Sequence, residues 1–116
     1  MKIVVLLILL LTLLTGSAWA EQIDFDRLVE AIWKAEGGAK AKYAYGIVSV
    51  PYKDKTEARQ ICMNTCKNNW KRFVAQDKYA DYIEFLGSRY CPIGASNDPK
   101  GLNKNWVPNV KYWYNK

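Results

Sequence analysis

The sequence predicts a small, mainly α-helical domain with one core, and with an ordered loop or a short β-hairpin after its first helix. Three observations predict this fold class. Apolar side chains recur at helical spacing in several segments, and a residue type that caps helices precedes three of them. The 96 residues that follow a predicted leader are enough for one domain and too few for two.

The N-terminal segment predicts a secretory signal peptide over residues 1–20. Lys2 precedes an apolar run over residues 3–14, and Ala18 and Ala20 form a small-residue cleavage site. The run is shorter than the ~20 residues that a transmembrane helix needs. We therefore expect cleavage, export, a mature domain over residues 21–116, and no stable membrane insertion afterwards; an uncleaved anchor is the alternative.

The first helix of the mature chain is predicted over residues 25–36. Asp24 is its expected N-cap, and Gly37 and Gly38 form a C-terminal stop signal. Its apolar stripe comprises Phe25, Leu28, Val29, Ile32 and Trp33. Residues 39–55 carry a β-leaning run at 47–50 before Pro51, which predicts the ordered loop or short hairpin.

Three further helices are predicted. Thr56 is expected to cap a helix over residues 57–76, with an inner side made of Ala58, Ile61, Cys62, Thr65, Asn69 and Phe73. Asp77 is expected to cap a third helix that ends near Tyr90, with Tyr79, Tyr82, Ile83, Leu86 and Tyr90 as its apolar set. A loop over residues 93–104 leads to a short last helix that starts at Trp106 or Val107 and tolerates Pro108 in its first turn.

The amino-acid composition limits which partners, catalytic groups and metal sites we expect. The mature chain holds 16 basic and 11 acidic side chains, a net charge of +5, which suits a polyanionic partner or serves solubility alone. A nucleic-acid binder would need a denser basic stripe, so we expect no nucleic-acid partner. The chain has no histidine, which excludes Ser-His-Asp and Cys-His catalysis and the zinc sites that use imidazole. We expect neither a metal nor a cofactor.

The three cysteines predict one disulfide, because export places a small domain in an oxidising compartment. Cys62 and Cys66 lie at i and i+4 of a predicted helix, where they are badly placed to bond each other. Cys91 should therefore pair with one of them. Cys62 is favoured because it lies on the apolar side with Ala58 and Ile61, and Cys66 is the alternative.

Glu36 is the most informative position for function. It continues the apolar stripe of the first helix, at the end where the helix dipole disfavours an anion. Desolvation against the stripe and the dipole should both raise its pKa, which suits a general acid. A glutamate that reaches past the two glycines into water is the alternative.

Three motifs lie in the order found in the soluble lytic transglycosylases and goose-type lysozymes. Glu36-Gly37-Gly38 followed by Tyr45-Gly46-Ile47 resembles the active-site region of that family. The segment 85–92 resembles its Ala-Tyr-Asn-Ala-Gly motif with Tyr90 at the tyrosine, and the segment 105–110 resembles its closing segment. Gly37 replaces the family's serine, residues 47–48 replace Leu-Met-Gln, and Cys91-Pro92 replaces Asn-Ala.

The resemblance implies a compact lysozyme-like fold and a bacterial enzyme, in the periplasm or secreted, that cleaves the MurNAc-GlcNAc β-1,4 bond of peptidoglycan as a monomer. Glu36 is then the general acid and base, and closure of a 1,6-anhydro ring replaces attack by water. The residues expected to contact substrate are Tyr45, Gly46, Ile47, Asn69, Tyr90 and Trp106. For Tyr90 the alternative is a core tyrosine, and for Asn69 a surface amide.

Two other functions remain open at this point. A hydrolase of the same bond usually needs a second carboxylate about 5 to 9.5 Å away. Asp54 and Glu57 are the nearest candidates, but both are better explained as solvated residues beside the predicted Thr56 cap. The other function is a wall-binding module without catalysis, which would use the same groove.

Overall fold

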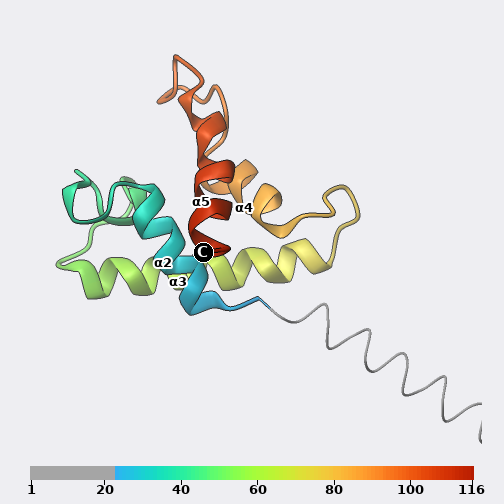
Figure 1. Ribbon diagram of the computed structural model, residues 1–116, viewed down its shortest axis with the longest axis horizontal. Helices are drawn as coiled ribbons and strands as arrows, with labels where there is room; N and C mark the ends of the chain where they lie inside the picture. The colour runs from blue at the N-terminus through green and yellow to red at the C-terminus, as the bar shows by residue number, and fades with distance from the viewer. Residues whose placement is uncertain (1–22) are drawn as a thin grey trace, which may run out of the picture.

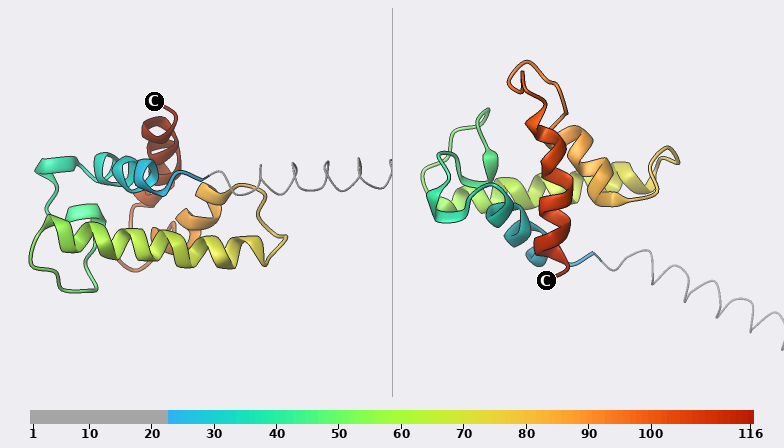
Figure 2. Two further views of the ribbon diagram at one scale, coloured as in Figure 1. Left: turned by 90° about the horizontal axis from the view of Figure 1, so that it is seen from below. Right: turned by 45° about the horizontal axis from the view of Figure 1, so that its top comes forward.

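The computed structural model describes residues 23–116, so the predicted signal peptide over residues 1–20 lies outside the described residues. Four α-helices and three short 3-10 turns make up the described chain, with no β-strand in that range. The longest helix, α3, forms one layer, α2 and α4 pack on it, and α5 packs against α2 and α4 (Figures 1 and 2). The mainly α-helical prediction is confirmed, and the connection after the first helix is the ordered loop rather than a hairpin.

Helix α2 (Phe25–Ala35) forms where the sequence predicts it. The Asp24 carboxylate accepts a hydrogen bond from the Arg27 N–H at 3.1 Å, which satisfies one of the free donors of the first turn. The face of α2 that the stripe predicted is buried, with Leu28, Val29 and Ile32 fully enclosed. Glu36 is the C-cap, and Gly37 follows with a φ of 109°, a backbone conformation that favours glycine.

The connection from α2 to α3 contains the 3-10 turns η1 (Gly38–Lys40) and η2 (Ala44–Gly46). The Ala44 N–H donates to the Tyr52 hydroxyl at 2.9 Å, which ties the middle of this loop to its last part before α3. Tyr45 has a φ of 58° and a fully buried side chain, so the loop is anchored in the core by its middle residue.

Helix α3 (Lys55–Val74) begins earlier than predicted, and Thr56 is not its cap. Asp54 is the N-cap, and its carboxylate accepts the Glu57 N–H at 2.9 Å. An ionised carboxylate at this position also interacts favourably with the positive end of the helix. The buried side of α3 consists of Ala58, Cys62, Met63, Cys66 and Asn69, whereas Ile61, Thr65 and Phe73 are only half-buried.

Helix α4 (Tyr82–Tyr90) starts later than predicted, with Asp81 rather than Asp77 as its N-cap. The Gln76 side chain explains the difference. Its amide donates to the carbonyls of Phe73 and Tyr79 and accepts the Tyr79 N–H at 2.8 Å. The backbone N–H and carbonyl of Tyr79 are therefore bound by a side chain, and residues 77–80 form a bend instead of the first turn of a helix.

The last part of the chain follows the prediction. After the loop, the 3-10 turn η3 (Leu102–Asn105) leads directly into α5 (Trp106–Tyr114). Helix α5 buries Trp106 and Val110. No helix among residues 23–116 combines the length and the apolar character needed to cross a bilayer.

Candidate active site

Glu36 lies half-buried at the end of α2, beside the turn η2. No hydrogen bond from another described residue reaches its carboxylate with good geometry. The backbone N–H of Glu36 is used for the helix, where it donates to the Ile32 carbonyl at 2.9 Å. The carboxyl group is therefore held in place by packing and by its backbone, and its oxygens stay available to another molecule.

Gly46 makes room for this carboxyl group. A Cβ atom at position 46 would lie 2.5 Å from Oε2 and 2.7 Å from Cδ of Glu36, closer than real Cβ atoms approach other atoms. The φ of Gly46 is 70°, which is a second reason for glycine here. The structure thus places Gly46 directly against the Glu36 carboxyl group.

Burial raises the pKa of Glu36 above its ordinary value of 4.5. Interaction with the indole of Trp106 offsets part of this effect, although the buried Trp106 Nε1 has no hydrogen bond of good geometry among the described residues. Desolvation is the dominant cause because it disfavours the charged carboxylate. A carboxyl group in this state holds its proton to a higher pH than an exposed glutamate, as a general acid must.

Tyr90 forms one wall next to Glu36. Its hydroxyl donates to the Tyr45 carbonyl and lies 3.7 Å from the Sγ of Cys62. Its ring stacks on that of Trp106, with the ring centroids 5.2 Å apart and the planes 27° from parallel. Burial raises the pKa of Tyr90, so its hydroxyl stays protonated and remains a donor. The sequence left two roles open for Tyr90, a core tyrosine and a residue of the site. In the structure its ring packs in the core, and the residue also lines the hollow at Glu36.

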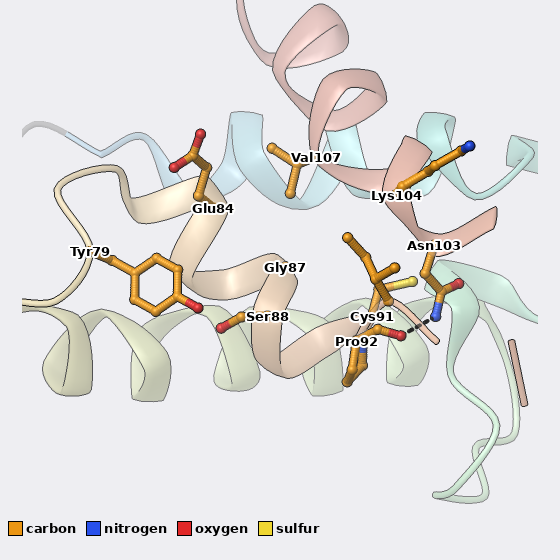
Figure 3. Close-up of a pocket in the computed structure, with 10 residues that line it drawn as sticks. Tyr79, Glu84, Gly87, Ser88, Cys91, Pro92, Asn103, Lys104 and Val107 are labelled. Atoms are coloured by element: carbon orange, nitrogen blue, oxygen red, sulfur yellow. Dashed lines mark hydrogen bonds between the residues drawn. The ribbon is translucent and has the colours of Figure 1, made fainter. Parts of the chain in front are cut away.

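Three hollows adjoin one another around Glu36. The Glu36 hollow, about 170 Å³, is lined by Glu36, Gly46, Tyr90, Cys91, Pro92, Asn97 and Asn103. On one side it shares Gly46 and Tyr90 with the Arg89 hollow, about 220 Å³, which Ile47, residues 48–50 and Arg89 also line. On the other side it shares Cys91, Pro92 and Asn103 with the Gly87 hollow, about 410 Å³ (Figure 3). Glu36 thus lines the one hollow of the three that has lining residues in common with both of the others.

Three predicted contact residues do not line these hollows. The Tyr45 side chain is fully buried, because this residue anchors its loop in the core, and it meets the site only through its carbonyl. Trp106 is 6% exposed, and its ring packs on Tyr90, so it is not a free platform for a sugar. Asn69 is buried, but its amide donates to the Thr65 carbonyl of its own helix and does not hold Tyr90.

The three thiols are free, so the predicted Cys62–Cys91 bond is not formed in this structure. Cys62 is fully buried, and its sulfur faces the Tyr90 hydroxyl. Cys91 is half-buried, and burial together with the charges of Glu36 and Asp98 raises its pKa to about 11. The thiol that lies against Cys62 is instead that of Cys66, one helical turn further along α3, and this contact lowers the pKa of Cys62.

Asn97 and Asn103 line the Glu36 hollow and were missed by the sequence reasoning. Asn103 donates from its amide to the Pro92 carbonyl at 2.7 Å, which joins the end of α4 to η3. Both residues lie in the segment read as a plain loop. A useful signal was the number of amide and carboxylate side chains there, because Asp98 accepts hydrogen bonds from the N–H groups of Gly94 and Asn103 and so gives the loop a fixed shape.

Glu36 is the one carboxylate that lines its hollow among residues 23–116. Asp54 and Glu57, the candidates for a second carboxylate, are exposed at the start of α3, where Asp54 is occupied as a cap. No group of cysteine, aspartate and glutamate side chains in this range is arranged to hold a metal ion.

Comparison with known proteins found no matching family model, no matching curated protein and no matching solved structure.

Proposed function

We propose that the protein is a lytic transglycosylase that cleaves the β-1,4 bond between MurNAc and GlcNAc in peptidoglycan, with Glu36 as general acid and then general base. The observation that carries this proposal is a half-buried carboxyl group with a raised pKa that lines a hollow, with two further hollows that share lining residues with it. A polymer that extends across these hollows would present an internal bond to the acid, with units on both sides.

The reaction needs two steps from one residue. Glu36 first donates its proton to the glycosidic oxygen, so the bond to the MurNAc anomeric carbon breaks and the GlcNAc hydroxyl leaves. The resulting carboxylate then accepts the proton of the MurNAc 6-hydroxyl, and the oxygen of this hydroxyl forms a bond to the anomeric carbon of the same sugar. The products are a 1,6-anhydro ring and a regenerated acid, and no water is consumed.

The surroundings of Glu36 support one-carboxyl chemistry. A hydrolase usually places a second carboxylate opposite the acid, as nucleophile or base. The other described residues that line the Glu36 hollow are Gly46, Tyr90, Cys91, Pro92, Asn97 and Asn103, which offer amides, a hydroxyl and a thiol instead. Asn97 and Asn103 are suited to contact the N-acetyl and hydroxyl groups of a sugar. A nucleophile within the substrate removes the need for a second acidic residue.

The test uses two proteins, the native protein and its Glu36→Gln variant, each obtained by expressing the full chain. Both are incubated with purified peptidoglycan. Mass spectrometry of the released fragments should show anhydromuropeptides from the native protein and none from the variant. Products with a reducing end would contradict the transglycosylase and favour a hydrolase. Pelleting with wall material without any cleavage would leave a binding module as the function.

The Gln variant is a matched control, because it keeps the size of the side chain and removes its acidity. Retained binding of Glu36→Gln to the wall material would show that the loss of products is chemical. We place the site of action outside the cytoplasm, where the wall polymer lies, in agreement with the leader that the sequence predicts over residues 1–20.

A further inference from the structure

Three consecutive aromatic side chains end helix α5, next to the start of α2 (Figure 1). The Asp24 N–H donates to the Tyr114 hydroxyl at 3.2 Å, which joins the two helix ends. Tyr112 is 56% exposed, whereas Trp113 and Tyr114 are half-buried. The rings of Tyr112 and Trp113 meet edge to face, with their centroids 5.0 Å apart. This end of the molecule therefore presents aromatic surface to solvent.

Each of the three rings has a basic side chain over it. The distances to the ring centroids are 5.3 Å from Lys34 Nζ to Trp113, 4.6 Å from Lys116 Nζ to Tyr112, and 5.5 Å from Arg27 Cζ to Tyr114. None of these three cations makes an ion pair within residues 23–116. Cation–π contacts at exposed sites are weak, so the cations stay available to an anion. We call these three aromatic and three basic residues the α5 patch.

The acidic side chains close to the α5 patch do not cancel its positive charge. Asp24 borders the patch, and its carboxylate is occupied as the cap that accepts the Arg27 N–H. Asp26 forms an ion pair with Arg59 at 2.8 Å, and the charge of Glu30 also acts on Arg59. Positive charge beside tyrosine and tryptophan is typical of surfaces that contact anionic bilayers, where the rings lie at the level of the headgroups.

The α5 patch also lies where the N-terminal part of the chain joins the domain. Ile23 is the first described residue, and the next residue, Asp24, is the one that contacts Tyr114. The apolar run over residues 3–14 precedes this point in the sequence. A bilayer that holds this run, during export or as an anchor, therefore has the α5 patch beside the point of attachment. Glu36 lies at the other end of α2, about 18 Å from Asp24 along the helix axis.

We propose that the α5 patch binds the surface of a bilayer that contains anionic phospholipids. The rings of Tyr112 and Trp113 enter the headgroup layer, and Arg27, Lys34 and Lys116 contact lipid phosphates. This contact involves none of the residues that line the Glu36 hollow, and it does not rest on the proposed function.

The first experiment measures how strongly the protein sediments with two kinds of vesicle, phosphatidylglycerol mixed with phosphatidylcholine, and phosphatidylcholine alone. The ratio of the two affinities cancels the contribution of the apolar run, which does not depend on lipid charge. Lys34→Glu with Lys116→Glu should lower this ratio about thirtyfold, because each cation near an anionic surface supplies a factor of about five.

The matched control is Lys53→Glu with Lys67→Glu, which makes the same change of charge at exposed positions outside the α5 patch. The control should keep most of the preference for anionic vesicles. A ratio that falls equally in both double variants, or in neither, would overturn the proposal. Displacement of the native protein from the vesicles by soluble polyphosphate, at equal phosphate concentration, would also overturn it by showing a site for polyanions in general.

The second experiment locates the contact in the native protein. The indole N–H signals are recorded by NMR with phosphatidylglycerol nanodiscs that carry a gadolinium-chelating lipid, and Trp113→Phe and Trp33→Phe assign two of them. The Trp113 signal should broaden more than the Trp33 signal, because Trp33 packs against Gly38 and Lys55, away from the end of α5. Equal broadening of the two signals, or none, would overturn the α5 patch as the bilayer contact.

Discussion

The end of α2 and the loop before η3 each hold a shielded carboxylate beside a glycine with a positive φ, but they treat it differently. Glu36 faces Gly46, whose missing Cβ makes space for it, and accepts no hydrogen bond of good geometry from the described chain. Asp98 accepts the N–H groups of Gly94 at 3.0 Å and Asn103 at 3.1 Å. Burial raises the pKa of Glu36, whereas backbone N–H donors lower that of Asp98.

The difference shows what separates a reactive carboxyl group from a structural one. Asp98 is 6% exposed and is covered by its own thin loop rather than by the core, and its backbone donors favour the charged form. Glu36 lies against the core and lacks such donors, so its neutral form is favoured. Shielding from solvent is common to both, and the hydrogen bonds decide which group stays an acid.

The largest effect is expected from Gly46→Ala. The new Cβ would overlap the Glu36 carboxyl group, and an L-residue is strained at this φ, so the free energy of unfolding should fall by about 2–4 kcal/mol. Urea denaturation measures this fall. Gly94→Ala is the matched control, because its φ is 74° and nothing lies within 4 Å of the new Cβ. It should cost only the ~1–2 kcal/mol of backbone strain, and equal costs for the two variants would show that the Glu36 contact is not tight.

Tyr90→Phe should have the next effect. It removes the hydroxyl that donates to the Tyr45 carbonyl but keeps the ring stacked on Trp106, so we expect a loss of about 1–2 kcal/mol. The comparison is with Tyr112→Phe, since Tyr112 is exposed and its hydroxyl contacts only Lys116 within the described chain. Thermal unfolding of both variants measures the effect. A Tyr90→Phe protein as stable as Tyr112→Phe would mean that the wall beside Glu36 is not held by this bond.

The smallest effects are pH dependences of opposite sign. Because the pKa of Glu36 is raised on folding, the native protein should lose stability as the pH rises above about 4.5, and Glu36→Gln should not share this loss. Because the pKa of Asp98 is lowered, Asp98→Asn should be less stable than the native protein at neutral pH, with the gap closing as the pH falls below 3.8. Denaturation midpoints across pH 2 to 8 test both, and two slopes of the same sign would contradict the comparison.

Much of the fold follows from local sequence signals. The bounds and the buried face of α2 are predicted from residues close together in the chain: the Asp24 cap, the apolar stripe and Gly37. The structure agrees with each of these predictions. The start of α4 could not be predicted in this way, because it depends on the Gln76 side chain binding backbone groups on both sides of a turn. The prediction of Thr56 as the cap of α3 is wrong, because helical spacing does not fix the first residue of a helix and the Asp54 side chain accepts the Glu57 N–H two residues earlier in the chain.

The site was predictable only where one element determines it. The helical repeat and the glycines place Glu36 at the end of an apolar stripe, and this required no knowledge of the rest of the fold. Whether Tyr45 and Trp106 face solvent or core depends on how η2 and α5 pack, and the structure buries both side chains. The side chains of residues 94–103 indicate a loop with a fixed shape, but that Asn97 and Asn103 of this loop line a hollow together with Glu36 depends on how distant parts of the chain pack.

Burial against the core raises the pKa of Glu36, and NMR titration of the side-chain carboxyl carbons measures this shift. Glu36→Gln and Asp98→Asn assign the two signals. We expect Glu36 to titrate above 4.5 and Asp98 to titrate below 3.8. A Glu36 signal that titrates at or below 4.5 would contradict the proposal that desolvation by the core prepares this carboxyl group to act as an acid.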